Sequence, residues 1–146
     1  MAFETQSTGI VHVIQLAVAP VFLLSGVGVT LTVLTNRLAR IVDRARVLEA
    51  RPDHVEPELQ DRLHADLAAL SQRAKLVNLA LTLSTSCALL VCLVIMALFV
   101  GALFDVDLSG LIAVLFVAAM AAFVGGLVSY LREIFVATAS LRIGRG

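Results

Sequence analysis

Charged residues are excluded from three long stretches of the chain. The segments Thr5–Asn36, Leu76–Phe104 and Leu108–Leu131 contain no Asp, Glu, Lys or Arg. Each is longer than the roughly 20 apolar residues that a helix needs to cross the hydrocarbon core of a bilayer. The pattern therefore predicts three transmembrane helices, at about residues 10–36, 76–104 and 108–131.

The helical pattern of apolar residues continues beyond the first predicted span. Steps of four and three residues, the spacing of a coiled-coil seam, relate Leu34, Leu38, Ile41, Ala45 and Leu48. No proline or glycine interrupts the segment before Pro52. We therefore expect the first helix to reach about Ala50.

A second helix is expected to start near Pro57, because proline suits the first position of a helix. Its apolar residues keep the same spacing into the second span; they are Leu59, Leu63, Leu67, Leu70, Ala74 and Val77. The predicted fold is thus an all-α membrane protein. Three transmembrane helices form one domain over residues 1–146, and the first two extend into a cytoplasmic antiparallel helical hairpin at about 37–75. The tail, 132–146, is expected to form one or two helical turns.

The distribution of basic residues predicts the orientation. Residues 37–75 hold eight of the eleven Lys and Arg, and residues 132–145 hold the other three. Basic residues accumulate on the cytoplasmic side of membrane proteins. We expect the N-terminus outside, and the hairpin and the C-terminal tail in the cytoplasm. The N-terminal segment lacks the basic region of a cleaved signal peptide, so the first helix is expected to remain in the mature protein.

Small and polar residues cluster near the cytoplasmic end of each predicted span. On the first span one helical face contains Ser25, Gly28, Thr32, Thr35 and Asn36. On the third span the small residues, which recur at every fourth position, include Ala118, Ala122, Gly125, Gly126 and Ser129. Small residues let membrane helices pack closely. The favoured interpretation is a helix interface within or between subunits; the alternative is a water-accessible vestibule lined by the first set.

Three arginines, Arg37, Arg40 and Arg44, lie on one side of the first helix as it leaves the membrane. Three interpretations are open. The arginines bind anionic lipid headgroups; they form ion pairs with acidic residues of the hairpin; or they form a ring at the cytoplasmic mouth of an oligomeric pore, where charged rings select ions.

Two motifs resemble a known family. The stretch QLAVAPVFLLSG covers Gln15–Gly26 and LTNRLARIVDRAR covers Leu34–Arg46. Together they resemble the opening of domain-of-unknown-function family 2721, which consists of small bacterial membrane proteins. The resemblance implies a similar architecture in a bacterial inner membrane, and it implies no activity.

The remaining residues favour no catalytic chemistry. No pair of nucleophile and base, no spacing of metal ligands and no phosphate loop is recognisable, so we expect neither an enzyme nor a bound cofactor or metal. The nearly neutral hairpin without aromatic residues argues against nucleic-acid binding. Two hypotheses remain. The first is a homo-oligomer that conducts an ion or small solute; the second is a non-conducting scaffold or regulatory module whose hairpin binds a protein partner.

Overall fold

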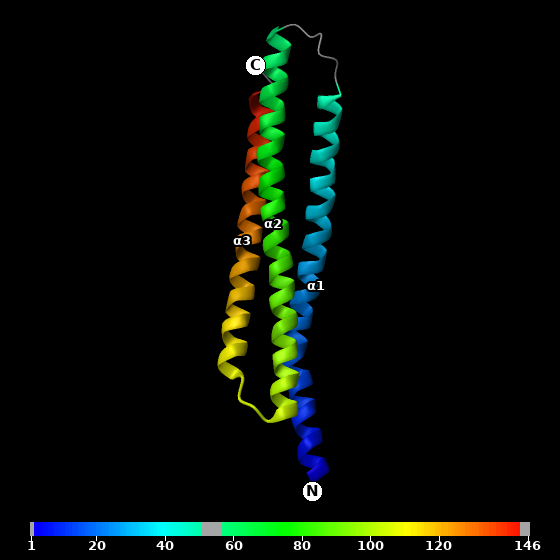
Figure 1. Cartoon of the computed structure of the whole chain (residues 1–146), viewed down its shortest axis with the longest axis vertical. Coiled ribbons are helices and arrows are strands. Elements are labelled where there is room, and N and C mark those ends of the chain that lie inside the picture. Colours follow the sequence, from blue (N-terminus) through cyan, green and yellow to red (C-terminus); the bar gives the residue numbers. More distant parts are fainter. Residues whose placement is uncertain (1, 51–56, 144–146) are drawn as a thin grey trace. The chain divides into compact units, whose positions relative to one another are not determined.

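The structure is a computed structural model of the chain, and it describes residues 2–50 and 57–143. These residues form three α-helices and no strand. Helix α1 spans Ala2–Glu49, α2 spans Pro57–Phe104 and α3 spans Ser109–Ile143 (Figure 1). All three are long and apolar enough to cross a membrane. The predicted all-helical class with three candidate membrane-spanning helices is confirmed.

The helix ends agree with the sequence signals at most positions. Helix α1 ends at Glu49, one residue before the predicted end, and α2 starts at the predicted Pro57. Helix α3 differs, because it continues to Ile143 instead of ending in one or two turns after Leu131. The tail contains good helix formers such as Arg132 and Glu133, and it has no proline or glycine before Gly144. Nothing in the sequence therefore ends the helix earlier.

The chain divides into two compact units. Unit 1 contains α1 up to Leu31, α2 from Leu83 and α3 up to Val124. Unit 2 contains α1 from Thr32, α2 up to Thr82 and α3 from Gly125. The division follows the charge pattern, since every Lys and Arg of the sequence belongs to unit 2.

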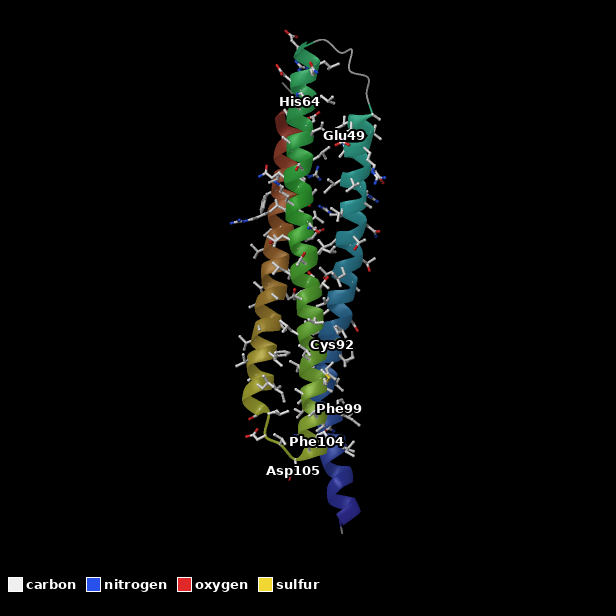
Figure 2. All side chains as sticks on the ribbon, in the orientation of Figure 1. Glu49, His64, Cys92, Phe99, Phe104 and Asp105 are labelled. Carbon is white, nitrogen blue, oxygen red and sulfur yellow. The ribbon has the colours of Figure 1, made fainter. Side chains whose placement is uncertain are left out.

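The core of unit 1 is built from small and β-branched residues of all three helices. Val27, Cys87, Val91 and Ala119 are buried in one cluster, with Phe123 among the side chains packed against it. Many other apolar side chains of this unit are exposed, including Phe22, Phe99 and Leu103; Figure 2 labels Phe99 near the end of α2. Exposed apolar side chains are expected where lipid replaces water as the solvent.

The turn between α2 and α3 also belongs to unit 1, and Figure 2 labels Phe104 and Asp105 there. Asp105 has a positive φ of 55°. The N–H of Val106 donates to the carbonyl of Gly101 at 3.1 Å. This combination is a Schellman motif, in which one left-handed residue closes the end of the helix. On the other side of the turn, the Asp107 carboxylate accepts from the N–H of Ser109 at 3.0 Å.

The core of unit 2 contains the predicted seam of α1 and the part of the α2 seam from Leu70 onward, whereas Leu59 is exposed. Leu34, Ile41, Leu70, Val77 and Ala80 form one buried cluster of α1 and α2. The partly buried residues packed against it are Leu38, Ala45, Leu48, Ala74, Leu81 and Tyr130. In water, each fully buried aliphatic side chain of this kind stabilises a fold by roughly 1.5–3 kcal/mol. The seam therefore holds the segments of α1 and α2 together and places α3 beside them through Tyr130.

Candidate functional site

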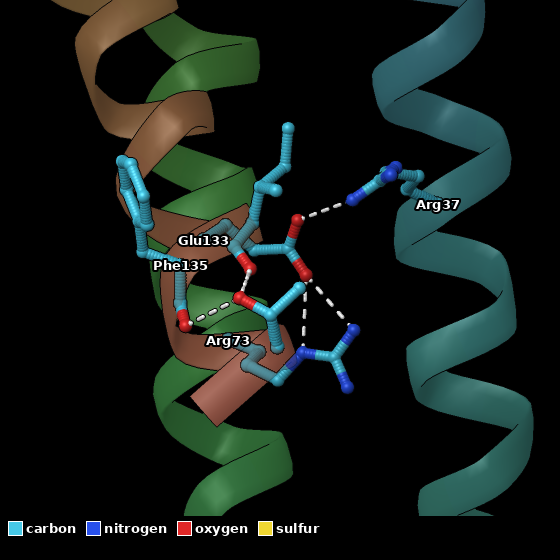
Figure 3. Close-up of polar contacts among 6 residues, drawn as sticks. Arg37, Arg73, Glu133 and Phe135 are labelled. Carbon is cyan, nitrogen blue, oxygen red and sulfur yellow. Dashed lines mark hydrogen bonds and ion pairs between the residues drawn. The ribbon is translucent and has the colours of Figure 1, made fainter. Parts of the chain in front are cut away.

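A buried carboxylate lies at the centre of unit 2. Glu133 of α3 has a fully buried side chain, with a relative exposure of 0%. A charge without solvent is stable only where it is paired and hydrogen-bonded. Glu133 meets this condition through arginines of the two other helices, Arg37 and Arg73 (Figure 3).

The two arginines use different oxygens of the carboxylate. Arg37 of α1 donates from Nη1 to Oε2 at 2.6 Å. Arg73 of α2 donates from Nε and Nη2 to Oε1, at 3.0 and 2.9 Å. We name these three residues the Arg37–Glu133–Arg73 cluster. Hydrogen bonds between ions are shorter and about twice as strong as neutral ones, so the cluster fixes all three helices of unit 2 to one another.

The arginines remain in partial contact with solvent. Their side chains have relative exposures of 39% for Arg37 and 26% for Arg73. The guanidinium of Arg37 also lies over the ring of Tyr130, with its Cζ 5.0 Å from the ring centroid, in the range of a cation–π interaction. Two arginines and one carboxylate leave the cluster with a net charge of +1.

The face of α3 that carries Glu133 also carries small residues, which allow close packing. Gly126 and Ser129 are buried, and Glu133 follows Ser129 by four residues, on the same side of the helix. The Ser129 hydroxyl donates to the carbonyl of Gly125 at 2.9 Å and thus needs no other partner. Close packing at this stripe brings Glu133 within reach of both arginines.

A pocket of about 210 Å³ lies next to the cluster. All three helices contribute to its wall, which consists of Arg44, Leu48, Asp66, Ala69, Leu70, Arg73 and Ala137. Ala137 lies one helical turn beyond Glu133 on α3. Arg73 belongs both to the cluster and to the wall of the pocket. Among the described residues no group of three His, Cys, Asp or Glu side chains is placed to hold a metal ion.

The residues predicted as pore-lining candidates are distributed differently. Ser25, Gly28, Thr32, Thr35, Asn36, Arg40 and Arg44 are exposed. The Ser25 hydroxyl donates to the carbonyl of Val21 within its own helix, at 3.4 Å. Among these candidates, Arg37 contacts α3 through Glu133, and Arg44 lines the pocket that residues of α2 and α3 share. A role of the exposed face in a pore or in an interface between subunits remains a prediction.

The helix-packing candidates on α3 are partly used within the chain. Gly126 and Ser129 are buried, Gly125 and Ala122 are half-buried, and Ala118 is exposed. Ala122 packs against the core of unit 1. Within the chain, the buried residues of this stripe are thus those towards its C-terminal end, and a helix interface between subunits remains a prediction.

Glu133, Arg73 and Tyr130 were not among the predicted site residues. Ion pairs were expected only between the arginines and acidic residues of the hairpin, whereas the acid that pairs with Arg37 lies on α3. A signal existed in the spacing, since steps of four, three and four residues lead from Ala122 through Gly126 and Ser129 to Glu133. Continuing the small-residue stripe by one step would have placed this acid on the packed face.

Comparison with protein families agrees with the motifs in α1. The model of a family described as "Protein of unknown function (DUF2721)" matches residues 17–143. The chain belongs to the DUF2721 family. A search of curated proteins and a search of solved structures gave no match. The match to DUF2721 includes Arg37, Arg73 and Glu133, so the cluster lies within the segment shared with the family.

Proposed function

We propose that this DUF2721 protein is a non-conducting membrane scaffold or regulatory module. Its three helices cross a bacterial inner membrane with the N-terminus outside. The part of unit 2 outside the spans, which includes the hairpin of α1 and α2, lies in the cytoplasm and binds a protein partner through its charged surface.

The observation that carries this proposal is the Arg37–Glu133–Arg73 cluster. It ties the segments of α1, α2 and α3 in unit 2 into a single block and directs the Arg37 side chain towards Glu133. At the mouth of an oligomeric pore, that side chain would instead have to face the axis shared by the subunits. The exposed surface of the block carries both signs of charge, among them Arg40, Asp43, Arg46, Glu58, Asp61, Arg62 and Lys75. Mixed charges suit a specific protein interface, because complementary patterns steer the partner and reject others.

The experiment is photocrosslinking in native membranes. A photoreactive residue at exposed Gln60 of unit 2 is compared with one at Val114 of unit 1, which is 67% exposed. We expect one dominant foreign protein to be captured from position 60 and not from position 114. That product should disappear when Asp61→Lys and Arg62→Glu are combined, because the pair keeps the net charge and reverses the local pattern. Capture of copies of the same chain alone would contradict the proposal.

A second candidate function is a homo-oligomer that conducts an ion or small solute. The exposure of the polar face with Ser25, Thr32 and Asn36 favours it, since polar side chains in a span are usually covered by protein or line water. The mass of the complex in nanodiscs tests this candidate first. A ring-sized oligomer with flux in liposomes supports it, and Arg40→Glu should then change ion preference. A monomer excludes it.

A further inference from the structure

The pocket beside Glu133 contains hydrogen-bonding groups that the protein itself does not use. A guanidinium has five N–H donors. Arg73 uses two of them for Glu133, which leaves three. In the part of the chain that the structure describes, Arg44 and Asp66 make no hydrogen bond or ion pair. Two arginines of the pocket wall, on two different helices, thus have eight N–H donors between them that no described residue uses.

The wall between these polar groups is apolar. Leu48, Leu70, Ala69 and Ala137 line the same pocket and provide no competing donor or acceptor side chain. A pocket of about 210 Å³ is several times the share of one water molecule, which is roughly 30 Å³. It therefore admits a small polyatomic anion with part of its hydration.

The charges of the pocket favour an anion. Arg44 and Arg73 of the pocket wall supply two positive charges and Asp66 supplies one negative charge, so the wall is positive by one. The hydrogen bonds to Glu133 already hold the Arg73 guanidinium in place. This side chain therefore loses little conformational entropy when it binds a ligand. A planar guanidinium can donate two parallel hydrogen bonds to two oxygens of one phosphate group.

We propose that the pocket lined by Arg44 and Arg73 binds a phosphate group. The site is independent of the protein-docking surface proposed above and goes beyond general attraction to anionic lipids. Arg44 and Arg73 donate to the phosphate oxygens. Asp66 at the same pocket limits the negative charge that the site accepts and weakens the binding of a dianion.

The phosphate can belong to a soluble molecule or to a lipid headgroup. Arg44 lies eight residues after Asn36, which is about 12 Å along a helix. If the first span ends near Asn36, this distance exceeds the headgroup layer, which is about 5–8 Å thick on each side. A soluble phosphate is therefore the expected source.

The test titrates inorganic phosphate into the full-length protein in an uncharged maltoside detergent and follows the arginine Nε–H signals by NMR. We expect saturable binding that moves the Arg73 signal. Arg44→Gln should weaken binding about tenfold, since a charge-assisted hydrogen-bonding partner is lost. The matched control is Arg46→Gln, an exposed arginine on the same helix outside this pocket, which should change binding less than about twofold.

Two further arms make the result decisive. Asp66→Asn should tighten phosphate binding about threefold, whereas Asp61→Asn, outside the pocket, should not. In parallel, protein from vesicles of phosphatidylglycerol and phosphatidylcholine is analysed by native mass spectrometry. Retention of phosphatidylglycerol that depends on Arg44, without binding of inorganic phosphate, assigns the site to a lipid headgroup. Absence of both, or equal effects of Arg44→Gln and Arg46→Gln, overturns the proposal.

Discussion

Arg37 of α1 donates a hydrogen bond to Glu133 of α3 at 2.6 Å, although 96 residues separate them along the chain. Arg73 of α2 reaches the second oxygen of the same carboxylate. One acidic side chain therefore joins segments of all three helices. The cluster makes unit 2 a defined block on which a binding surface can be built.

Replacing Glu133 should destabilise the protein more than replacing any exposed acid. Glu133→Ala leaves two arginines without their shared partner, and breaking a buried ion pair costs about 3–5 kcal/mol. Because both arginines retain access to solvent, we expect a loss nearer about 2–3 kcal/mol in the free energy of unfolding. Reversible unfolding in detergent measures it. Glu133→Gln should cost less, since the amide oxygen still accepts one bond. The matched control, Glu58→Ala at an exposed position, should change stability by less than about 0.5 kcal/mol.

The two arginines should differ in their tolerance of lysine. Arg73 uses Nε and Nη2 together on one oxygen, a geometry that a single ammonium cannot reproduce. Arg37 donates one bond, and its contact with Tyr130 is also available to lysine. Arg73→Lys should lower the free energy of unfolding by about 1–2 kcal/mol, and Arg37→Lys by less than about 1 kcal/mol. An equal loss for both variants would show that only the charge matters.

The turn between α2 and α3 contains a site where glycine should improve stability. Asp105 adopts a left-handed conformation, with φ of 55°, that costs energy for a residue with a Cβ. Asp105→Gly should raise the free energy of unfolding by about 0.5–1 kcal/mol, because the Schellman motif favours glycine at this position. Asp107→Gly serves as the comparison, since it removes the acceptor for Ser109 and should lower stability instead. Thermal unfolding of both variants in the same detergent distinguishes the two effects.

Asp107 links the stability of this turn to pH. Hydrogen bonds from the side chain and then the backbone of Ser109 lower the pKa of the Asp107 carboxyl below its usual value. Its contribution to stability is therefore complete above the unfolded pKa of about 3.9 and is lost as pH falls through the lower folded value. Ser109→Ala should move the pKa of Asp107 back towards its usual value, because the side-chain bond is the larger cause. Titration of the Asp107 carboxyl carbon by NMR checks this; an unchanged pKa would contradict the assigned cause.

The helices could be predicted from the sequence because they depend on local patterns. Charge-free runs long enough for a bilayer, the spacing from Leu34 to Leu48 and the proline at 57 predicted the end of α1 to within one residue and the start of α2. Helix α1 begins at Ala2, before the predicted start of the span at about residue 10. The extent of α3 was underestimated. The polar residues of the tail indicated the end of the membrane span, and the helix was expected to end soon after it. Helical propensity does not depend on the bilayer, and α3 continues to Ile143.

The cluster was harder to predict because it depends on how the three helices pack. Arg37 and Glu133 are far apart in sequence, and basic residues after a span are usually explained by the positive-inside rule. No local sequence pattern predicts which acidic residue forms an ion pair with a given arginine. The buried face of α3 could have been recognised from the steps between Gly126, Ser129 and Glu133, but the partner on α2, Arg73, follows only from the assembled unit.

The most direct test of this account is a pair of double-mutant cycles in which Glu133→Ala is combined in turn with Arg37→Ala and Arg73→Ala. Contacting residues in one ion-pair network show interaction energies of about 0.5–3 kcal/mol. We predict at least about 1 kcal/mol for each pair. Unfolding effects that add within about 0.5 kcal/mol in both cycles would show that Glu133 does not join the three helices.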